Sequence, residues 1–244
     1  MNKYEKYDQI TLFINSHPKH IFVNMAKNKL RRFEEMRTFH NVIQFPFDDM
    51  QNEFWLKEKW NKIYFKNNNP VVLELACGKG EYTIGLAEKF RQKNFIGIDI
   101  KGARLWRGAK TALEKNLSNV AFLRTRIDFI EHCFAKNEIS EIWITFPDPQ
   151  PNKEKKRLTH TAFLNRYKNI ISPNCHVHLK TDNIELYKFT LEIIKKDNFR
   201  LRVSTDNLYS ENILEFEEAK SIQTFYEKHF LAEGKNITYL SFLL

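Results

Sequence analysis

The chain has 244 residues, 42% hydrophobic and 28% charged, which is enough to bury one sizeable core and typical of a soluble globular protein. Its formal net charge of +9 favours a polyanionic partner, RNA or DNA before a membrane, although a lysine-rich codon bias would give the same excess. No apolar run approaches the roughly 20 residues that span a bilayer, and no secretory signal follows the polar N-terminus, so the sequence predicts a cytoplasmic protein with no membrane partner.

The three cysteines, Cys77, Cys133 and Cys175, form no closely spaced pair. Neither a zinc site nor a disulfide framework is therefore indicated, and we expect no bound metal. An odd number of scattered cysteines also fits a reducing cytosol.

Residues 1–60 are expected to form a basic N-terminal extension to a catalytic domain of residues 61–244. Apolar residues from Ile21 to Met36 could mark one side of a helix that carries several lysines and arginines. Such a segment is either an arm for a nucleic acid or a solvated helix packed on the edge of the domain. The sequence leaves both interpretations open.

The rest of the chain is organised around the segment 71–87. An apolar run, Val71–Leu75, includes Glu74 and is followed by a glycine-containing turn and then by a helical pattern from Glu81. A strand, a glycine turn and a helix bring a ligand close to bare backbone at a helix N-terminus. Glu74 would repel a pyrophosphate and attract an ammonium group, such as that of S-adenosylmethionine. A nicotinamide dehydrogenase is therefore disfavoured.

Strand and helix patterns alternate along the remaining chain. The expected strands after the first cover residues 94–100, 119–126, 141–146, 176–180, 200–205 and 237–243. The helices expected late in the chain cover residues 127–134, 161–170 and 185–196. This alternation predicts an α/β fold with a doubly wound, mostly parallel sheet of seven strands wrapped by helices. Trp143 and Phe146 are expected to be core residues of the fourth strand.

The carboxyl ends of these strands carry candidate binding residues, because ligands of open α/β sheets bind there. Asp99 ends the second strand and could accept hydrogen bonds from ribose hydroxyls. Pro147–Pro151 follows the fourth strand, and its three prolines hold Asp148 in a stiff loop, directly before the cation cluster 152–157. The helix after Asp99 has a broad basic face, for which RNA contact and simple solvation are equally open: Lys101, Arg104, Arg107 and Lys110.

Together these residues resemble the bacterial tRNA (guanine-N7-)-methyltransferases over about residues 69–242. The shared signatures are ELACGKG at 74–80, FPDP at 146–149, KRLT at 156–159, KTDN at 180–183 and TFYE at 224–227. The glycine turn is common to many methyltransferases. The FPDP, KTDN and TxYE motifs in that order are specific to this family.

The resemblance implies a class I, Rossmann-like methyltransferase fold, S-adenosylmethionine as methyl donor, and a guanine in the variable loop of tRNA as acceptor for a monomer or homodimer. The implied cofactor-binding residues are Glu74, Ala76, Gly78, Gly80, Asp99, Arg126 and Asp148. The implied substrate-binding residues are Lys153, Lys156, Arg157, Asp182, Thr224, Tyr226 and Glu227. Asp148 is the candidate catalytic residue, because a fixed carboxylate would stabilise the positive charge that the guanine gains.

The chain departs from the family pattern at several positions. Ala76 stands where glycine is usual, and its methyl group fits the turn if its φ is negative. Arg126 stands where an acid usually contacts the adenine, and Asp128 could compensate. Gln150 replaces a tryptophan, and the family's substrate-binding lysine falls one residue before Lys153, which becomes the nearest candidate. These departures motivate an alternative, a non-catalytic tRNA-binding module that retains the fold. A second rival is a methyltransferase that acts on a small molecule or a protein.

Overall fold

The computed structural model describes residues 30–45 and 52–244 of the chain. The chain divides into two compact units, Met1–Phe39 and His40–Leu244. In the first unit, residues 30–37 are helical, and the Thr38 hydroxyl donates a hydrogen bond of 2.8 Å to the Glu35 carbonyl as the helix ends. Most of the basic helix expected from Ile21 onward lies outside the described residues.

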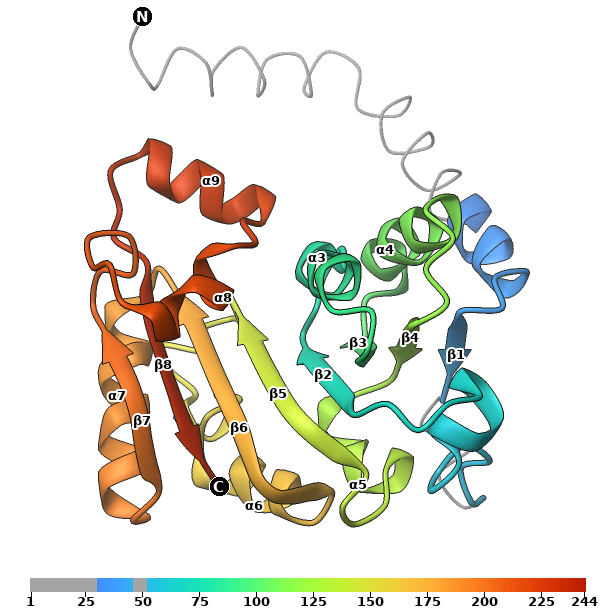
Figure 1. Ribbon diagram of the computed structural model, residues 1–244, viewed down its shortest axis with the longest axis horizontal. Coiled ribbons are helices and arrows are strands. Elements are labelled where there is room, and N and C mark those ends of the chain that lie inside the picture. The colour runs from blue at the N-terminus through green and yellow to red at the C-terminus, as the bar shows by residue number, and fades with distance from the viewer. Residues whose placement is uncertain (1–29, 46–51) are drawn as a thin grey trace, which may run out of the picture. The chain divides into compact units, whose positions relative to one another are not determined.

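The second unit contains an eight-stranded sheet in the order β1-β4-β3-β2-β5-β6-β8-β7 (Figure 1). The strands are β1 (Val42–Gln44), β2 (Val71–Leu75), β3 (Asn94–Asp99), β4 (Val120–Arg124), β5 (Ile139–Thr145), β6 (Ile171–Thr181), β7 (Arg200–Thr205) and β8 (Thr238–Leu243). Neighbouring strands are parallel except that β8 runs antiparallel to both β6 and β7. The mostly parallel α/β sheet expected from the sequence is thus confirmed.

The expected count of seven strands was wrong, because β1 adds an eighth. β1 pairs in parallel with β4, and Phe45 N donates to the Arg124 carbonyl just beyond the paired residues. Three residues are too few to show an alternating pattern, so the sequence gives no strand signal there. The compact unit consequently begins at His40, inside the segment 1–60 that was assigned to the extension.

Seven α-helices in the described part of the second unit connect or cover these strands. They are α3 (Glu81–Lys89), α4 (Gly102–Glu114), α5 (Ile130–Cys133), α6 (Thr161–Lys168), α7 (Ile184–Lys196), α8 (Glu217–Lys220) and α9 (Phe225–Ala232). A π-helical turn, Trp60–Phe65, buries Trp60, whose indole donates a 3.1 Å hydrogen bond to the Cys133 carbonyl. Residues before position 61 therefore also contribute to the core of this unit.

Both faces of the central strand β2 are covered, which is why all five of its residues are buried. Leu73 and Leu75 point into the main hydrophobic core, together with Leu164 of α6 and Ile194 of α7. Side chains alternate along a strand, so Glu74 points to the opposite face. On that face α3 covers the sheet, and the ring of its Tyr82 lies 5.0 Å from that of Trp143.

The strand order reverses between β2 and β5, which are adjacent in the sheet. From β2 the chain continues outward through β3 and β4, and it then returns to β5 and continues outward to β6 on the other side. Crevices beyond the carboxyl ends of strands at such a reversal are the usual ligand sites of open α/β sheets. Glu74 near the end of β2 and Thr145 at the end of β5 flank this point.

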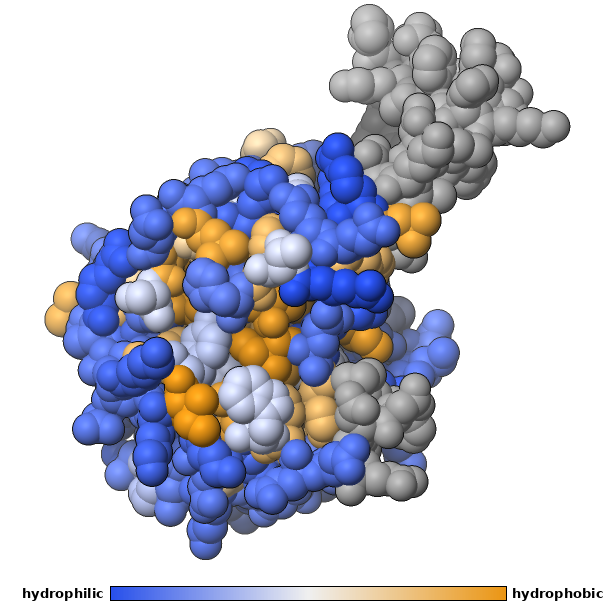
Figure 2. Space-filling model, turned by 90° about the vertical axis from the view of Figure 1, so that its right-hand side faces the viewer, coloured by the Kyte–Doolittle hydropathy of each residue, from blue (hydrophilic) through white to orange (hydrophobic). Residues whose placement is uncertain are grey.

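The face in Figure 2 is mainly hydrophilic, with apolar residues gathered near the middle of the view. Within the described part of the chain, no helix has the length and apolar character needed to cross a membrane.

Candidate active site

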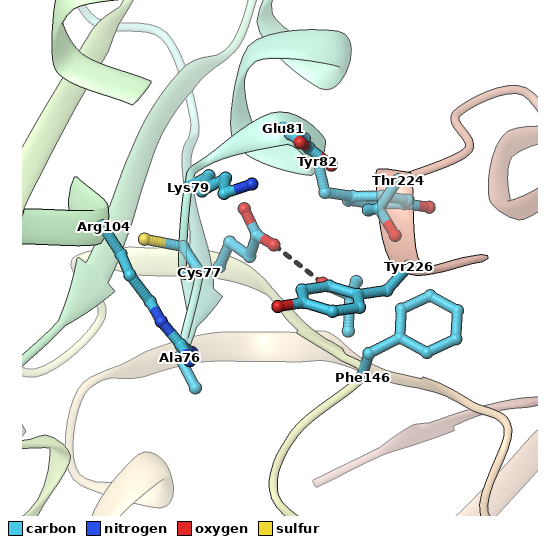
Figure 3. Close-up of a pocket in the computed structure, with 12 residues that line it drawn as sticks. Ala76, Cys77, Lys79, Glu81, Tyr82, Arg104, Phe146, Thr224 and Tyr226 are labelled. Atoms are coloured by element: carbon cyan, nitrogen blue, oxygen red, sulfur yellow. Dashed lines mark hydrogen bonds between the residues drawn. The ribbon is translucent and has the colours of Figure 1, made fainter. Parts of the chain in front are cut away.

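Glu74 is a buried carboxylate held by two threonines. Its Oε2 accepts hydrogen bonds from the backbone N–H of Thr83, at 2.7 Å, and from the Thr83 hydroxyl, while its Oε1 accepts one from Thr145 at 2.7 Å (dashed line in Figure 3). Burial raises the pKa of Glu74 to about 7, and these hydrogen bonds oppose that rise. Oε1 accepts one hydrogen bond and retains acceptor capacity, so the carboxylate can also bind a cationic group.

The turn after β2 adopts left-handed backbone at three positions. Ala76, Gly78 and Gly80 have φ values of 57°, 57° and 67°. A Cβ at Gly80 would lie 2.4 Å from the ring of Phe122, whereas the same position at Gly78 faces open space. The negative φ that would accommodate the Ala76 methyl group without strain is not observed. Its methyl group therefore costs about 1–2 kcal/mol at this position.

Asp99 fixes this turn from the end of β3. Its Oδ2 accepts a 2.9 Å hydrogen bond from Gly78 N, and its Oδ1 accepts one of 2.7 Å from Lys101 N. Only 8% of Asp99 is exposed. The carboxylate is thus oriented by the backbone on both sides and presents its free acceptor capacity at the edge of the sheet.

Two cavities meet at Ala76. The first has a volume of about 80 Å³ and is lined by Glu74, Ala76, Cys77, Gly78, Lys79, Glu81, Tyr82, Arg104, Thr145, Phe146, Thr224 and Tyr226. The second has a volume of about 380 Å³ and is lined by Ala76, Asp99, Ile100, Thr125, Arg126, Ile127, Asp128, Gln150, Lys155, Lys156, Leu158 and Phe163. In Figure 3 the side chains of Lys79, Phe146 and Tyr226 surround the first cavity.

Five of the seven expected cofactor residues line these cavities, and Gly80 and Asp148 line neither. Glu74 and Gly78 line the first, Asp99 and Arg126 line the second, and Ala76 lines both. Arg126 does not stand alone, because its guanidinium donates to the Asp128 carboxylate at 2.9 and 3.2 Å. An acid is therefore present in the second cavity, two residues beyond the expected position.

Asp148 is exposed and lies in a strained corner between the two cavities. Phe146 lines the first cavity and Gln150 the second, and both have a φ of 47°. The Asp148 carboxylate accepts a 3.1 Å hydrogen bond from Gln150 N and lines neither cavity itself. Phe146 is only partly buried, so its assignment to the core was wrong, whereas the core assignment of Trp143 is confirmed. Left-handed backbone at two non-glycine residues is a feature that clusters at functional sites.

The cation cluster after this corner separates into exposed and buried members. Lys153, Lys155 and Lys156 are exposed, and the last two line the second cavity. Arg157 is only 7% exposed, and its Nε donates a 3.1 Å hydrogen bond to the Pro149 carbonyl. Its guanidinium also lies 4.3 Å from the centre of the Phe189 ring. Arg157 is therefore engaged inside the protein, where it supports the loop of Asp148.

The TFYE segment forms the start of α9 and also contains both exposed and buried residues. Thr224 and Glu227 form a reciprocal capping box, and Glu227 is fully buried. Tyr226, 48% exposed, lines the first cavity together with Thr224. The Thr-x-x-Glu spacing is itself the signature of a capping box, a signal that could have revealed the structural role of Glu227.

Asp182 lies apart from both cavities. It lines a separate hollow of about 410 Å³ with Asp206, Lys235 and others. Several residues that line the first cavity were not among the expected cofactor or substrate residues: Cys77, Lys79, Glu81, Tyr82, Arg104, Thr145 and Phe146. Glu81 accepts a 2.6 Å hydrogen bond from Phe225 N and so docks α9 onto α3.

Across residues 30–45 and 52–244, no group of three His, Cys, Asp or Glu residues could hold a metal ion.

Comparisons with known proteins agree with this geometry. Residues 68–240 match the family model described as "Putative methyltransferase". The chain is 53% identical over 220 residues to the tRNA (guanine-N(7)-)-methyltransferase of Christiangramia forsetii, covering 89% of this chain and 98% of the relative. It is 45% identical to the enzyme of the same name from Bacteroides fragilis, covering 90% and 87%.

Solved structures share the fold at low identity. The 16S rRNA methyltransferase KamB aligns with a TM-score of 0.58 and 11% identity, covering 75% of this chain and 91% of that one. A SAM-dependent methyltransferase from Aquifex aeolicus aligns with a TM-score of 0.50 and 14% identity, covering 76% and 88%. The sheet order and these neighbours define a class I methyltransferase fold. Within that class, the chain belongs to the tRNA (guanine-N(7)-)-methyltransferase family.

Proposed function

We propose that this protein transfers a methyl group from S-adenosylmethionine to N7 of a guanine in the variable loop of tRNA. The observation that carries the proposal is the lining of the first cavity. Residues from three motifs of the family converge there: Glu74 of the glycine turn, Phe146 of FPDP, and Tyr226 of TFYE. A cavity shared by these motifs allows a cofactor and a base to meet.

The paired cavities fit an amino-acid-bearing nucleoside. The buried carboxylate of Glu74 would hold its ammonium group, and the oriented carboxylate of Asp99 would accept hydrogen bonds from ribose hydroxyls. Open space beside Gly78 lets a ligand approach the backbone. Asp128, beside Arg126, offers an acceptor for the amine of the adenine. When bound, S-adenosylmethionine supplies an electrophilic methyl group.

The chemistry on the substrate side needs a fixed negative charge rather than a base. Guanine N7 has a lone pair and no hydrogen, so the protein has no proton to remove at that atom. The purine becomes positively charged as the new bond forms, and a nearby carboxylate stabilises this charge more than it stabilises the neutral base. Asp148, held by Gln150 N between the two cavities, is suited to that role, with Asp182 second. The strained corner keeps the carboxylate oriented.

The exposed lysines 153 and 156 would contact tRNA phosphates, and Thr224 and Tyr226 would contact the guanine. We place the activity in the cytoplasm, where tRNA is modified, for a protein that acts as a monomer or a homodimer. The non-catalytic alternative is disfavoured, because an acid is present beside Arg126 and the Asp148 corner is intact.

Incubation of the purified protein with unmodified tRNA and methyl-labelled S-adenosylmethionine tests the proposal. Nucleoside analysis by mass spectrometry should find the label in N7-methylguanosine, from one position in the variable loop. Asp148→Asn should lower the rate strongly and leave cofactor affinity nearly unchanged, because the carboxylate is proposed to stabilise the charge that the guanine gains only as the methyl group is transferred. Label in another nucleoside would overturn the assignment, and tRNA binding without methyl transfer would favour the non-catalytic module.

A further inference from the structure

A third cavity of the second unit is an open groove with a strongly basic lining. It has a volume of about 710 Å³ and lies along α3 and α4. The connection between α8 and α9 lines its other side. The residues that line it are Lys79, Glu81, Ile84, Gly85, Glu88, Lys89, Arg107, Thr111, Lys115, Ser221, Ile222, Gln223 and Lys228. We call this set the basic groove.

Five of these residues are cations and two are acids, and both acids are already engaged. Glu81 accepts the backbone N–H of Phe225 at 2.6 Å, and Glu88 pairs with Lys115 at 2.5 Å. Lys89, Arg107 and Lys228 are exposed and form no ion pair among the described residues. The groove therefore presents uncompensated positive charge, which attracts a polyanion.

The cations are distributed along the groove rather than gathered at one point. Lys79 precedes α3 and Lys89 ends it, so the two are separated by the length of the helix, roughly 12 Å at 1.5 Å per residue. Arg107 lies within α4, and Lys228 lies on α9 across from them. A groove that carries positive charge along its length is suited to a nucleic-acid backbone, whose phosphates repeat, more than to a single anion.

The basic groove joins the first cavity directly. Lys79 and Glu81 line both, so the groove and the cavity share a border at the start of α3. The exposed ring of Phe225 stands at this border, 5.3 Å from the Lys79 ammonium. A strand bound along the groove would therefore pass beside the place where a base enters the cavity.

We propose that the basic groove holds the ribose-phosphate backbone of the tRNA on one side of the guanine that enters the first cavity. This inference rests on the proposed function and adds to it a defined surface. It also assigns a role to Arg107, one member of the basic face for which the sequence left RNA contact and solvation equally open. Arg104 of the same face lines the first cavity instead.

The test compares two variants with the same change in charge. The groove variant is Lys89→Ala, Arg107→Ala and Lys228→Ala, and the control is Lys188→Ala, Lys195→Ala and Lys196→Ala, exposed lysines of α7 on the opposite side of the sheet from α3. Binding of tRNA is measured by fluorescence anisotropy over a salt series, together with S-adenosylmethionine affinity and thermal stability. Methylation rates are measured over a series of tRNA concentrations that reaches saturation, which gives KM and kcat separately.

The groove variant should reduce the slope of log affinity against log salt by roughly two to three, because each lost phosphate contact removes about one. It should raise KM for tRNA and leave cofactor affinity, folding and kcat near wild type, while the control keeps the wild-type slope. Equal slopes of log affinity against log salt for the two variants would overturn the proposal that the basic groove binds tRNA. If wild type makes N7-methylguanosine and the groove variant keeps its slope, the groove fails and the proposed function stands. If the wild-type protein methylates no nucleoside and the groove variant binds tRNA more weakly than wild type, the groove stands and the proposed function fails.

Discussion

The ammonium of Lys180 and the carboxylate of Glu227 lie 2.7 Å apart, and neither side chain is exposed. Lys180 belongs to β6 and Glu227 to α9, so the pair ties the sheet to the helix whose first residues line the first cavity. Lys180 also donates to the carbonyls of Ala219, at 2.5 Å, and Ile222, at 3.0 Å. One buried ammonium therefore fixes the whole connection from α8 to α9.

Breaking this pair should destabilise the protein strongly. Glu227→Gln leaves the Lys180 charge buried without its partner, which typically costs about 3–5 kcal/mol. Burial already lowers the pKa of Lys180, so its charge depends on Glu227. Urea unfolding measures the change. Glu88→Gln, which breaks an ion pair whose side chains are 45% and 39% exposed, is the control and should cost about 1 kcal/mol or less. Similar small losses for both variants would contradict the anchoring role of Lys180 and Glu227.

Ala76→Gly should stabilise the protein. The left-handed φ of 57° penalises the alanine methyl by about 1–2 kcal/mol, and the extra freedom of glycine in the unfolded chain offsets about 0.4–1 kcal/mol. A net gain of up to about 1.6 kcal/mol is expected in urea unfolding. Ala87→Gly, in the buried face of the regular helix α3, is the matched control and should destabilise. Loss of stability in Ala76→Gly would show that the methyl group makes contacts that outweigh its strain.

Cofactor affinity should depend on pH through Glu74. Burial raises the pKa of Glu74 in the folded protein from 4.5 to about 7. The protonated side chain therefore contributes on the order of 3 kcal/mol to the stability of the ligand-free protein below about pH 4.5. This contribution is lost as the pH rises through 7. An ammonium ligand favours the ionised carboxylate. Affinity for S-adenosylmethionine should therefore rise with pH up to about 7 and then level off.

Isothermal titration across this pH range measures the effect. Glu74→Gln should bind more weakly and lose the rise, because its amide does not titrate. Its stability should also lack the decline near pH 7 that we expect for wild type. A wild-type affinity that stays constant between about pH 5.5 and 8.5 would mean that Glu74 does not face the ammonium group.

Arg157 and Lys156 are adjacent in sequence and should behave differently when each loses its charge. Arg157→Leu removes the hydrogen bond to Pro149 and the contact with Phe189, and should cost about 1–3 kcal/mol of stability with the salt dependence of tRNA binding unchanged. Lys156→Ala, at an exposed position, should change stability by about 0.5 kcal/mol or less and reduce the salt slope by about one. Equal effects of the two variants on the slope would place Arg157 on a phosphate.

The sequence predicted what local patterns encode. The apolar runs and their turns gave the parallel sheet, and Glu74 and Asp99 lie near the carboxyl ends of their strands, as expected. What it missed depends on contacts between distant segments. Arg157 is buried against Phe189 and Glu227 is buried against Lys180, and both partners are distant in sequence. Composition alone could therefore not distinguish these two buried charged residues from exposed ones. β1 was missed because its three residues are a strand only beside β4.

The most direct measurement of the central claim is a crystal structure with S-adenosylhomocysteine bound. The account predicts its amino group beside the Glu74 carboxylate in the first cavity and its ribose hydroxyls beside Asp99, with the sulfur facing the corner that holds Asp148. A ligand bound elsewhere on the protein, or bound with neither acid in contact, would contradict it.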